Sequence, residues 1–557
     1  MIFPQIKDEN FKKRIRTGAA YAPMIEYLKQ RLEETKAITE GYTYKEYEEY
    51  FKTGSRKEFE HKYFRLYRWR LATSAILYYI YETEEYYDIL LETIWAVCNE
   101  YSWCLPNHSE DETEEQNIFD FIDLFAAETG QAMAEILYFV GDKLPARLVR
   151  RMKFELDRRI FKPFERRSFW WEKSPTNWAA VCAGSVGMVY LYERPEGFES
   201  VKERIYSALD SFLSGFSDEG VCFEGLGDWN YGFGYYIYFA ALLYDVTDGR
   251  EDILHRGLVE KIAHFQQKMF ISGSVVSFSD CPRDTIYQPG LTCYLAKTFA
   301  GVAVPKNAVP EWMDNCARFS SCVRNLIWFD ENEPLSDETG WEFMSSAGWY
   351  ITRKKNFSFA AKAGHNAEPH NQNDVGSFII ADESGQILVD YGSGEYTNQY
   401  FMRQTRYLDL CNSSRGHSVP EIDGIAQCDG REFSSTNVTA SENEFLMDIA
   451  KTYPVEGLEK LERSFSAEDS KVTVCDKYVF SDLAVHDICE RFVSMHQPEL
   501  TDEGVRLGDF LLKSDYTPKI VQGTVKHHTT YQPETLYFVE YRGDFREFRL
   551  EIINIEK

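Results

Sequence analysis

The sequence predicts a multidomain α+β fold, in which an N-terminal α/α toroid (an incomplete α/α barrel) is followed by a C-terminal antiparallel β-sandwich. The chain has 557 residues, more than one hydrophobic core usually organises. Apolar residues recur with helical spacing from about residue 8 to residue 335. Near Trp341 the pattern changes to short β-rich runs. We therefore predict a helical domain over residues 1–335 and a β domain over residues 336–557.

The N-terminal part contains amphipathic helices joined by short breaks. Ala72, Ile76 and Ile80 share one helical face, because residues four apart in a helix lie side by side. Further helices are predicted over residues 118–140, 145–160, 176–193, 199–214, 232–246, 251–270 and 287–300. The breaks are rich in Gly, Pro and Asp, which favours stacked helical hairpins. The number of helices favours a closed or partly closed ring, and an open solenoid is the alternative.

The C-terminal third has the pattern of an all-β domain. Strands are predicted over residues 348–353, 357–362, 471–480, 486–494 and 536–555. The acidic stretch from Asp330 to Pro334 marks the boundary, and no low-complexity linker follows it. We expect a rigid interface between the halves, with the active site in the groove between them.

Composition excludes several classes of partner. The formal net charge is −28, so we expect no affinity for nucleic acid or for anionic membranes. No apolar run of about 18 residues is present, so no transmembrane helix is predicted. The 12 cysteines contain no CxxC spacing, which is typical of reduced thiols. The first residues contain no apolar signal segment, so we expect a cytoplasmic protein.

One polar stretch, residues 364–394, contains more hydrogen-bonding side chains than packing needs. Two histidines, three asparagines and a glutamine precede a predicted hairpin that runs from Phe378 to Val389. Burying such groups costs free energy unless they are paired. The stretch therefore predicts the edge of an active site or a metal site.

Three separated motifs carry a family resemblance. They are Ser174-Pro-Thr-Asn-Trp178, then Glu224-Gly-Leu-Gly-Asp-Trp-Asn-Tyr-Gly232, then the polar stretch from His370, followed by Val389-Asp-Tyr-Gly392 and Arg415-Gly-His417. Together they resemble the heparinase II/III-like polysaccharide lyases over roughly residues 60 to 430. That family combines an α/α toroid with a β-sandwich, which agrees with the fold predicted from the periodicity.

The resemblance implies β-elimination on a uronic acid, a carbon–oxygen lyase reaction. The C5 proton is too weakly acidic to leave unless the neighbouring carboxylate is neutralised, a base takes the proton and an acid protonates O4. Asn177 would hydrogen-bond the carboxyl group, Tyr231 would be the acid and also a candidate base, and His370 would take the C5 proton or assist Tyr231.

Each of these roles has an alternative. Asn177 could be a helix N-cap residue, since it precedes an apolar helical run. Tyr231 could pack on a glycine-rich turn, with Tyr235 or Tyr236 reaching the substrate instead. A lone histidine such as His370 is more often structural, although its polar setting favours a catalytic role.

Further residues are candidates for substrate binding. Arg403 and Arg406 could clamp a carboxylate or sulfate, because guanidinium binds such groups through two parallel hydrogen bonds. The complete set of candidates is Trp103, His108, Glu224, Tyr235, His365, Arg403 and Arg406.

The resemblance also implies a structural metal ion. Asp390 and His417 stand where many relatives have zinc ligands, but Gln372 replaces a second histidine. An amide oxygen is a harder and weaker ligand than imidazole, so zinc binding is weakened, Mn²⁺ or Ca²⁺ is used, or hydrogen bonds replace the ion. We predict a divalent ion, Zn²⁺ or Mn²⁺, that braces the strands around His370.

The predicted function is a lyase that cleaves uronic-acid glycans, such as heparan sulfate, chondroitin or hyaluronan oligosaccharides. A lyase for alginate or another polyuronate is one alternative, and a non-catalytic glycan-binding protein is another. An α/α-toroid hydrolase is a third, but a hydrolase needs two catalytic carboxylates instead of an Asn, Tyr and His set. An anionic oligosaccharide or polysaccharide is the expected partner, and the oligomeric state stays open.

Overall fold

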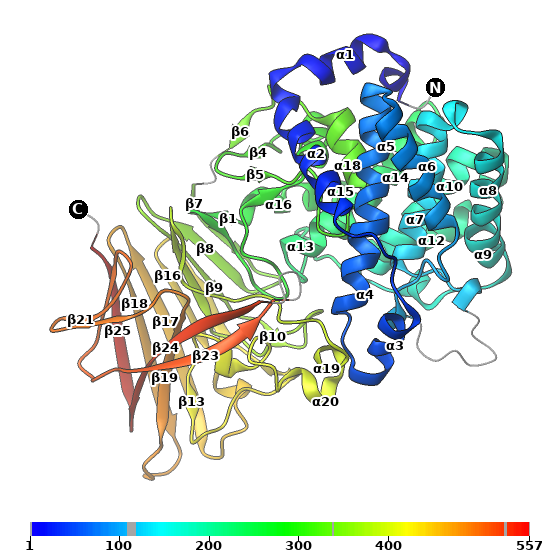
Figure 1. Ribbon diagram of the computed structural model, residues 1–557. Helices are drawn as coiled ribbons and strands as arrows, with labels where there is room; N and C mark the ends of the chain where they lie inside the picture. Colours follow the sequence, from blue (N-terminus) through cyan, green and yellow to red (C-terminus); the bar gives the residue numbers. More distant parts are fainter. Residues whose placement is uncertain (1–2, 109–117, 337–338, 528–531, 556–557) are drawn as a thin grey trace.

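The computed structural model describes residues 3–108, 118–336, 339–527 and 532–555. A ring of helices forms the N-terminal part, and β-sheets form the C-terminal part (Figure 1). The predicted fold class is confirmed: an α/α toroid is followed by antiparallel sheets. No helix in the described ranges is long and apolar enough to cross a membrane.

The toroid is built around a central helix, α10 (Asn177–Glu193), which packs against α7 (Leu124–Val140), α12 (Lys202–Leu213) and α14 (Gly234–Val246). Almost every side of α10 is buried, as expected for a helix that is apolar all round. Gly187 lets α14 pack closely on α10, since a Cβ at this position would overlap with the ring of Phe239. The outer helices include α2 (Ala22–Lys36), α3 (Tyr44–Thr53), α5 (Arg70–Tyr81), α6 (Glu84–Cys98), α8 (Ala146–Leu156), α17 (Pro289–Thr298) and α18 (Phe319–Trp328).

The predicted helix over residues 251–270 is wrong in its extent. The chain there forms two short helices, α15 (Gly257–Ala263) and α16 (Phe265–Lys268), and then the hairpin of β1 (Phe270–Ile271) and β2 (Ser274–Val275). Gly273, at φ 54°, forms the turn of this hairpin. The loop after β2 leads to Asp280, so this departure from helix places a side chain of the helical part at the junction with the β part.

Three sheets form the β part. The first has the order β12-β11-β9-β8-β7, the second β13-β19-β24-β23, and the third β15-β16-β17-β18-β25-β22-β21-β20. All pairings within these sheets are antiparallel. The strands of the first sheet are β7 (Gly340–Met344), β8 (Trp349–Arg353), β9 (Ser358–Lys362), β11 (Phe378–Asp382) and β12 (Gly385–Leu388).

The first sheet joins the two halves of the molecule. Because successive residues in a strand point to opposite faces, β8 sends Trp349 and Ile351 into the core of the helical part and Tyr350 into the core of the sandwich. In β11, Ile379 likewise lies in the core of the helical part and Phe378 in the core of the sandwich. Both faces are buried, so we expect little relative motion of the halves.

The second and third sheets complete the sandwich. Their long strands are β17 (Leu458–Glu468), β18 (Lys471–Phe480), β19 (Ile488–Ser494), β24 (Pro533–Gly543) and β25 (Glu547–Asn554). The last long helix, α18, ends at Trp328 and β7 begins at Gly340. The exact domain boundary at residue 335 stays a prediction.

Candidate functional site

His370 lies on the loop between β10 (His365–Asn366) and β11, with a left-handed backbone at φ 54°. Non-glycine residues in this conformation are uncommon, and they cluster at functional sites. The Nδ1 atom of His370 lies 2.6 Å from Oδ2 of Asp280, and its Nε2 atom lies 3.5 Å from Oε1 of Glu224. Two carboxylates of the helical part therefore hold the imidazole of a β-part residue.

Asp280 anchors this arrangement, and the sequence analysis did not select it. The hydroxyl of Tyr400 donates to its carboxylate at 2.7 Å, and Nε2 of Gln372 donates at 3.2 Å. The guanidinium of Arg406 lies 3.5 Å away. Asp280 is a single acid in a loop that belongs to no motif, so no sequence signal marks it, and only the tertiary structure shows its partners.

Asn177 is the first residue of α10, and Thr176 is the N-cap. The alternative of Asn177 as an N-cap residue is therefore wrong. Its side-chain amide donates instead to Oδ1 of Asp228 at 2.5 Å, and its backbone N–H lies close enough to Glu224 to lower the pKa of that carboxyl group. An amide group has two N–H donors, so the bond to Asp228 uses one of them.

Tyr231 lies in a π-helical turn, η9 (Trp229–Phe233), between α13 (Leu226–Asp228) and α14. Such turns occur often at functional sites, because the extra residue turns a side chain out of helical register. Gly232 packs directly on α10: a Cβ there would lie 2.9 Å from the Cβ of Asn177. The guanidinium of Arg318 lies 3.8 Å from the ring centre of Tyr231. Gly232, the residue after Tyr231, thus packs on Asn177, and Glu224 lies 3.5 Å from His370.

The electrostatics of this site follow from burial and from crowded carboxylates. Burial and the charge of Asp228 raise the pKa of Glu224 to about 8. Burial alone would lower the pKa of His370, but the hydrogen bond to Asp280 and the surrounding carboxylates raise it to about 10. Burial and the carboxylate of Glu128 raise the pKa of Tyr231 well above its usual value. At neutral pH the ligand-free site therefore holds an imidazolium, a neutral phenol and a protonated Glu224.

These charge states decide what the site can do chemically. An imidazolium and a carboxylic acid both donate hydrogen bonds, so His370 and Glu224 can face an anionic group. A neutral phenol is ready to donate a proton, as a general acid must be. His370 can accept a proton at Nε2 only after it has given one up.

Four further sequence candidates do not present their side chains to this site. Trp103 and Tyr235 are each 1% exposed, so neither is available to a ligand. The indole N–H of Trp103 donates to the backbone of Val97, which explains its burial. Arg403 lies on the surface, paired with Asp429.

His365 is the fourth of these candidates. Its Nε2 atom pairs with Glu368 at 3.1 Å. Tyr236, the second alternative acid, is buried, and its hydroxyl donates to the backbone of Ile253 at 2.7 Å. Of the predicted substrate-binding residues, Glu224, Arg406 and His108 remain as candidates. The guanidinium of Arg406 contacts Asp280, which holds His370.

The residues predicted to bind a metal lie behind His370. Asp390, His417 and Asp374 are buried, and their ligand atoms lie within 4.8 Å of one another. The buried side-chain atoms without a close hydrogen-bond partner include Oε1 of Gln372, Oδ2 of Asp390 and Nδ1 of His417, and the last two lie 3.4 Å apart. These are the three predicted ligands. Asp374 was not predicted, and it pairs with the buried ammonium of Lys362 at 2.6 Å.

The buried atoms of Gln372, Asp390 and His417 fit a divalent ion. Burying an oxygen or nitrogen atom without a partner costs free energy, and an ion bound to these atoms would offset that cost. The Nε2 atom of Gln372 donates to the backbone oxygens of Ser279 and Gly392, at 2.7 and 2.9 Å. These bonds fix the amide so that Oε1 is the atom left over. Burial alone would lower the pKa of His417, but Asp390 raises it. An ion would therefore compete with a proton for Nδ1.

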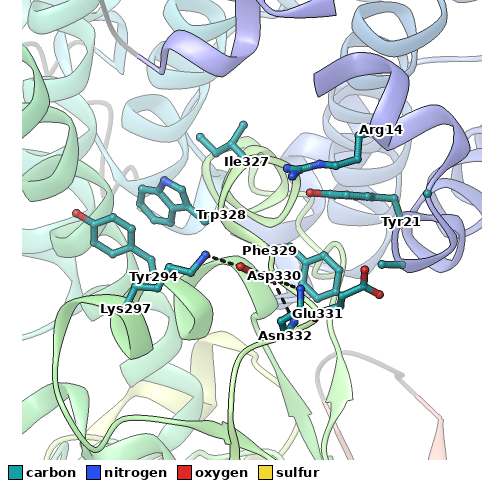
Figure 2. A pocket seen from close by; sticks show the side chains of 12 residues that line it. Arg14, Tyr21, Tyr294, Lys297, Ile327, Trp328, Phe329, Asp330, Glu331 and Asn332 are labelled. Atoms are coloured by element: carbon teal, nitrogen blue, oxygen red, sulfur yellow. Dashed lines mark hydrogen bonds and ion pairs between the residues drawn. The ribbon is translucent and has the colours of Figure 1, made fainter. Parts of the chain in front are cut away.

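Two cavities lie away from the site. One, of about 290 Å³, is lined by the side chains of Arg14, Tyr21 and Trp328 among others (Figure 2). Lys297 points to Asp330 there, at 2.8 Å. The other, of about 650 Å³, lies next to β1 and β8. No residue of either cavity contacts His370 or Tyr231 within the described ranges, so we assign neither to the chemistry.

Known proteins resemble this chain in the sequence of its C-terminal part and in its fold. Residues 337–487 match the family described as Heparinase II/III-like, C-terminal. No curated protein matches the chain by sequence. Three similar solved structures show the same fold over nearly the whole chain. A heparan sulfate lyase HepC mutant from Pedobacter heparinus has 14% identity, a TM-score of 0.55, and covers 98% of this chain and 90% of its own.

Heparinase III is 12% identical, with a TM-score of 0.59, and covers 99% of this chain and 92% of its own. The chondroitin AC lyase of Streptomyces coelicolor A3, solved with chondroitin sulphate, is 10% identical, with a TM-score of 0.57. The match covers 98% of this chain and 82% of that one. The resemblance inferred from the motifs is confirmed, both by the family match and by these folds.

Proposed function

Because this chain carries a heparinase II/III-like C-terminal domain on a toroid-and-sandwich fold, we propose that it is a polysaccharide lyase that cleaves uronic-acid glycans. One observation carries the proposal. Glu224 of the helical part lies near Asn177 and 3.5 Å from His370 of the β part, and Gly232, the residue after Tyr231, packs on Asn177. Donors for a carboxylate, a neutral phenol and an imidazole are the groups that β-elimination needs.

The uronate carboxylate would bind among the donors. The amide of Asn177 and the protonated Glu224 would hydrogen-bond it, and the positive charge of His370 would stabilise the negative charge that builds up on it in the transition state. The amide of Asn177 donates one N–H to the Asp228 carboxylate at 2.5 Å, and its second N–H would be the donor to the uronate.

The elimination itself breaks the C5–H bond and the C4–O4 bond and forms a C4=C5 double bond. Tyr231 would give its proton to O4 as the glycosidic bond breaks. In one route His370 first gives its Nε2 proton to solvent and then takes the C5 proton at Nε2, while Tyr231 protonates O4. In the other route Tyr231 first loses its proton to solvent, takes the C5 proton as a phenolate stabilised by Arg318, and gives that proton to O4. The configuration at C5 decides between these two routes.

Asp280 would position His370 in both routes. Its carboxylate holds the Nδ1 side of the ring, so Nε2 is the atom that faces Glu224. The same carboxylate accepts from Gln372, which connects His370 to the predicted metal ligands. A divalent ion held by Gln372, Asp390 and His417 would supply rigidity to the strands behind His370.

The substrate class follows from local charge and from the neighbours. The site of this chain, whose net charge is −28, contains three cations, each paired with a carboxylate: Arg318 with Glu128, and Arg406 and the imidazolium of His370 with Asp280. Heparan sulfate and chondroitin appear in the names of the similar structures, so glycosaminoglycan oligosaccharides are the first substrates to test. An alginate lyase is the second candidate, because the same groups suit any uronate.

The test is to incubate the protein with a panel of heparan sulfate, chondroitin, hyaluronan and alginate oligosaccharides and to follow absorbance at the unsaturated-uronate band. We expect one series to give absorbance and new chain ends together. Chain ends without absorbance would show a hydrolase, and binding without cleavage would show a glycan-binding protein.

The acid is tested by Tyr231→Phe, which removes only the phenolic oxygen. We expect at least about a hundredfold loss of kcat, since general acid catalysis contributes that much, and an unchanged Tm. Tyr44→Phe is the matched control, since Tyr44 is 76% exposed. Normal activity of Tyr231→Phe would refute the assignment of Tyr231 as the acid.

A further inference from the structure

A row of aromatic rings leads from Tyr231 towards the surface of the helical part. The guanidinium of Arg318 lies 3.8 Å from the ring centre of Tyr231 and 5.9 Å from that of Phe125. The ring of His108 stacks on Phe125, with the centres 5.9 Å apart. The candidate acid is thus continuous with a series of rings on α7 and its neighbours.

The row continues to two tryptophans. The ring of Trp178 lies 4.7 Å from that of His108, and the ring of Trp170 lies 4.7 Å from that of Trp178. Tyr231 is partly buried, and from Phe125 outwards exposure increases: Phe125 is 7% exposed, His108 and Trp178 are partly buried, and Trp170 is 58% exposed. The rings therefore open to solvent at the end that lies away from Tyr231.

The outer rings lie next to residues that buried hydrogen bonds fix. Trp178 directly follows Asn177 at the start of α10, and Nδ1 of His108 is 2.8 Å from Asp123, the N-cap residue of α7. Next to Trp170, the buried Trp171 donates its indole N–H to the backbone of Ile122 at 2.8 Å. A ring held in this way loses little conformational entropy when it binds a ligand.

We propose that Trp170 and Trp178, with His108 at their inner edge, form a sugar-stacking subsite for the part of a glycan that extends beyond the cleaved linkage. A pyranose ring presents an apolar face of C–H groups, and a flat indole presents apolar area together with one polar N–H group. Such a subsite needs no positive charge, which suits a chain with an excess of acidic residues. The subsite rests on the proposed lyase function, because its place beside Asn177 defines which ligand it holds.

The occupant is a glycan chain because of this continuity. The row begins at the groups that would act on the sugar and ends at an exposed indole, with Trp178 adjacent in sequence to the residue that would bind the uronate carboxylate. Sugars bound further along the chain would add binding energy at the exposed end.

The experiment compares Trp170→Ala with Trp95→Ala, a matched control on α6 whose indole is 51% exposed. For each variant, kcat/KM is measured on the octasaccharide and on the shortest cleaved oligosaccharide of the series that the wild-type protein cleaves. We expect the ratio of the two values to fall about three- to tenfold in Trp170→Ala, the size of one aromatic contact, and to stay at the wild-type value in Trp95→Ala.

A binding measurement separates this subsite from the lyase function. In the Tyr231→Phe background, octasaccharide binding is followed by tryptophan fluorescence, and Trp170→Ala should weaken it by the same factor. Normal cleavage with the same ratio in Trp170→Ala and Trp95→Ala would overturn the subsite and leave the lyase function standing. If the wild-type protein neither cleaves nor binds any glycan of the panel, both proposals fail.

Discussion

The pair of His370 and Asp280 is where the two parts of the molecule meet at the scale of single residues. His370 has a left-handed backbone, and so does Ser279, the neighbour of Asp280. Strained residues persist only where surrounding contacts hold them, and here the contact is a 2.6 Å hydrogen bond between the strained segments. We infer that the backbone strain is part of how the imidazole is oriented.

Asp280→Asn should lower kcat on the order of 10²–10⁴-fold with little change in KM, because an amide at this position no longer fixes the Nδ1 proton of His370. Steady-state kinetics test this, and the far-downfield imidazole proton in the NMR spectrum should disappear. Asp284→Asn is the matched control, since Asp284 is exposed on the same loop. If the Tm of Asp280→Asn fell so far that the protein was largely unfolded at the assay temperature, the loss of activity would point to a purely structural role of Asp280.

Glu224 gives a prediction about pH. Its pKa is raised to about 8, so it is protonated and neutral below pH 8 and becomes an anion above it. An anion beside the uronate carboxylate repels it, so activity should fall as the pH rises from 7 to 9. Glu224→Gln keeps a neutral donor and should remain active at pH 9, which pH–rate profiles of both proteins would show. An inactive Glu224→Gln at every pH would instead mark Glu224 as a proton-accepting carboxylate.

At the scale of elements, the site depends on the packing of η9 on α10. Gly232 makes the contact, since a Cβ there would come 2.8 Å from the Phe212 ring and 2.9 Å from the Cβ of Asn177. The π-helical turn and the start of α10 must therefore move together, and Tyr231 and Asn177 keep their relative positions.

Gly232→Ala should push η9 away from α10 and lower kcat about a hundredfold, since a displacement of about 1 Å can cost that much. Gly257→Ala is the control, because a Cβ at Gly257 meets nothing within 4 Å. The kcat and the Tm of both variants test this prediction. Full activity of Gly232→Ala would show that this contact does not position the site.

At the scale of the whole molecule, the five-stranded sheet holds the halves in register, and the predicted metal ligands lie behind His370. The first sheet buries one face in each core, so the loop that carries His370 leads into a strand, β11, that both halves fix. The predicted ligands Gln372, Asp390 and His417 each have one buried atom without a close hydrogen-bond partner.

Metal analysis of the purified protein should find about one divalent ion per chain, and a chelator should lower the Tm, because an ion that binds only the folded state stabilises it. Gln372→His should raise the affinity for zinc, since imidazole nitrogen is the better zinc ligand. Elemental analysis and chelator titrations of both proteins measure this. A metal-free protein whose Tm does not respond to zinc would show that Lys362 and His417 balance the buried carboxylates without an ion.

The sequence by itself determined the fold class and three of the central residues. Periodicity separates helices from strands because burial on one face needs apolar residues at a fixed spacing. Asn177, Tyr231 and His370 lie in motifs that carry a family resemblance, so they could be selected without coordinates.

Only the tertiary structure decided which other groups surround these three. Asp280, Arg318 and Glu128 are far from the motifs in sequence, and contacts between such segments arise from folding alone. Burial, which no local pattern measures, leaves Trp103 and Tyr235 only 1% exposed, with the ring of Tyr235 packed against that of Tyr231. The charges of His370 and Glu224 were likewise decided by the fold, because a pKa depends on how many carboxylates are brought together out of water.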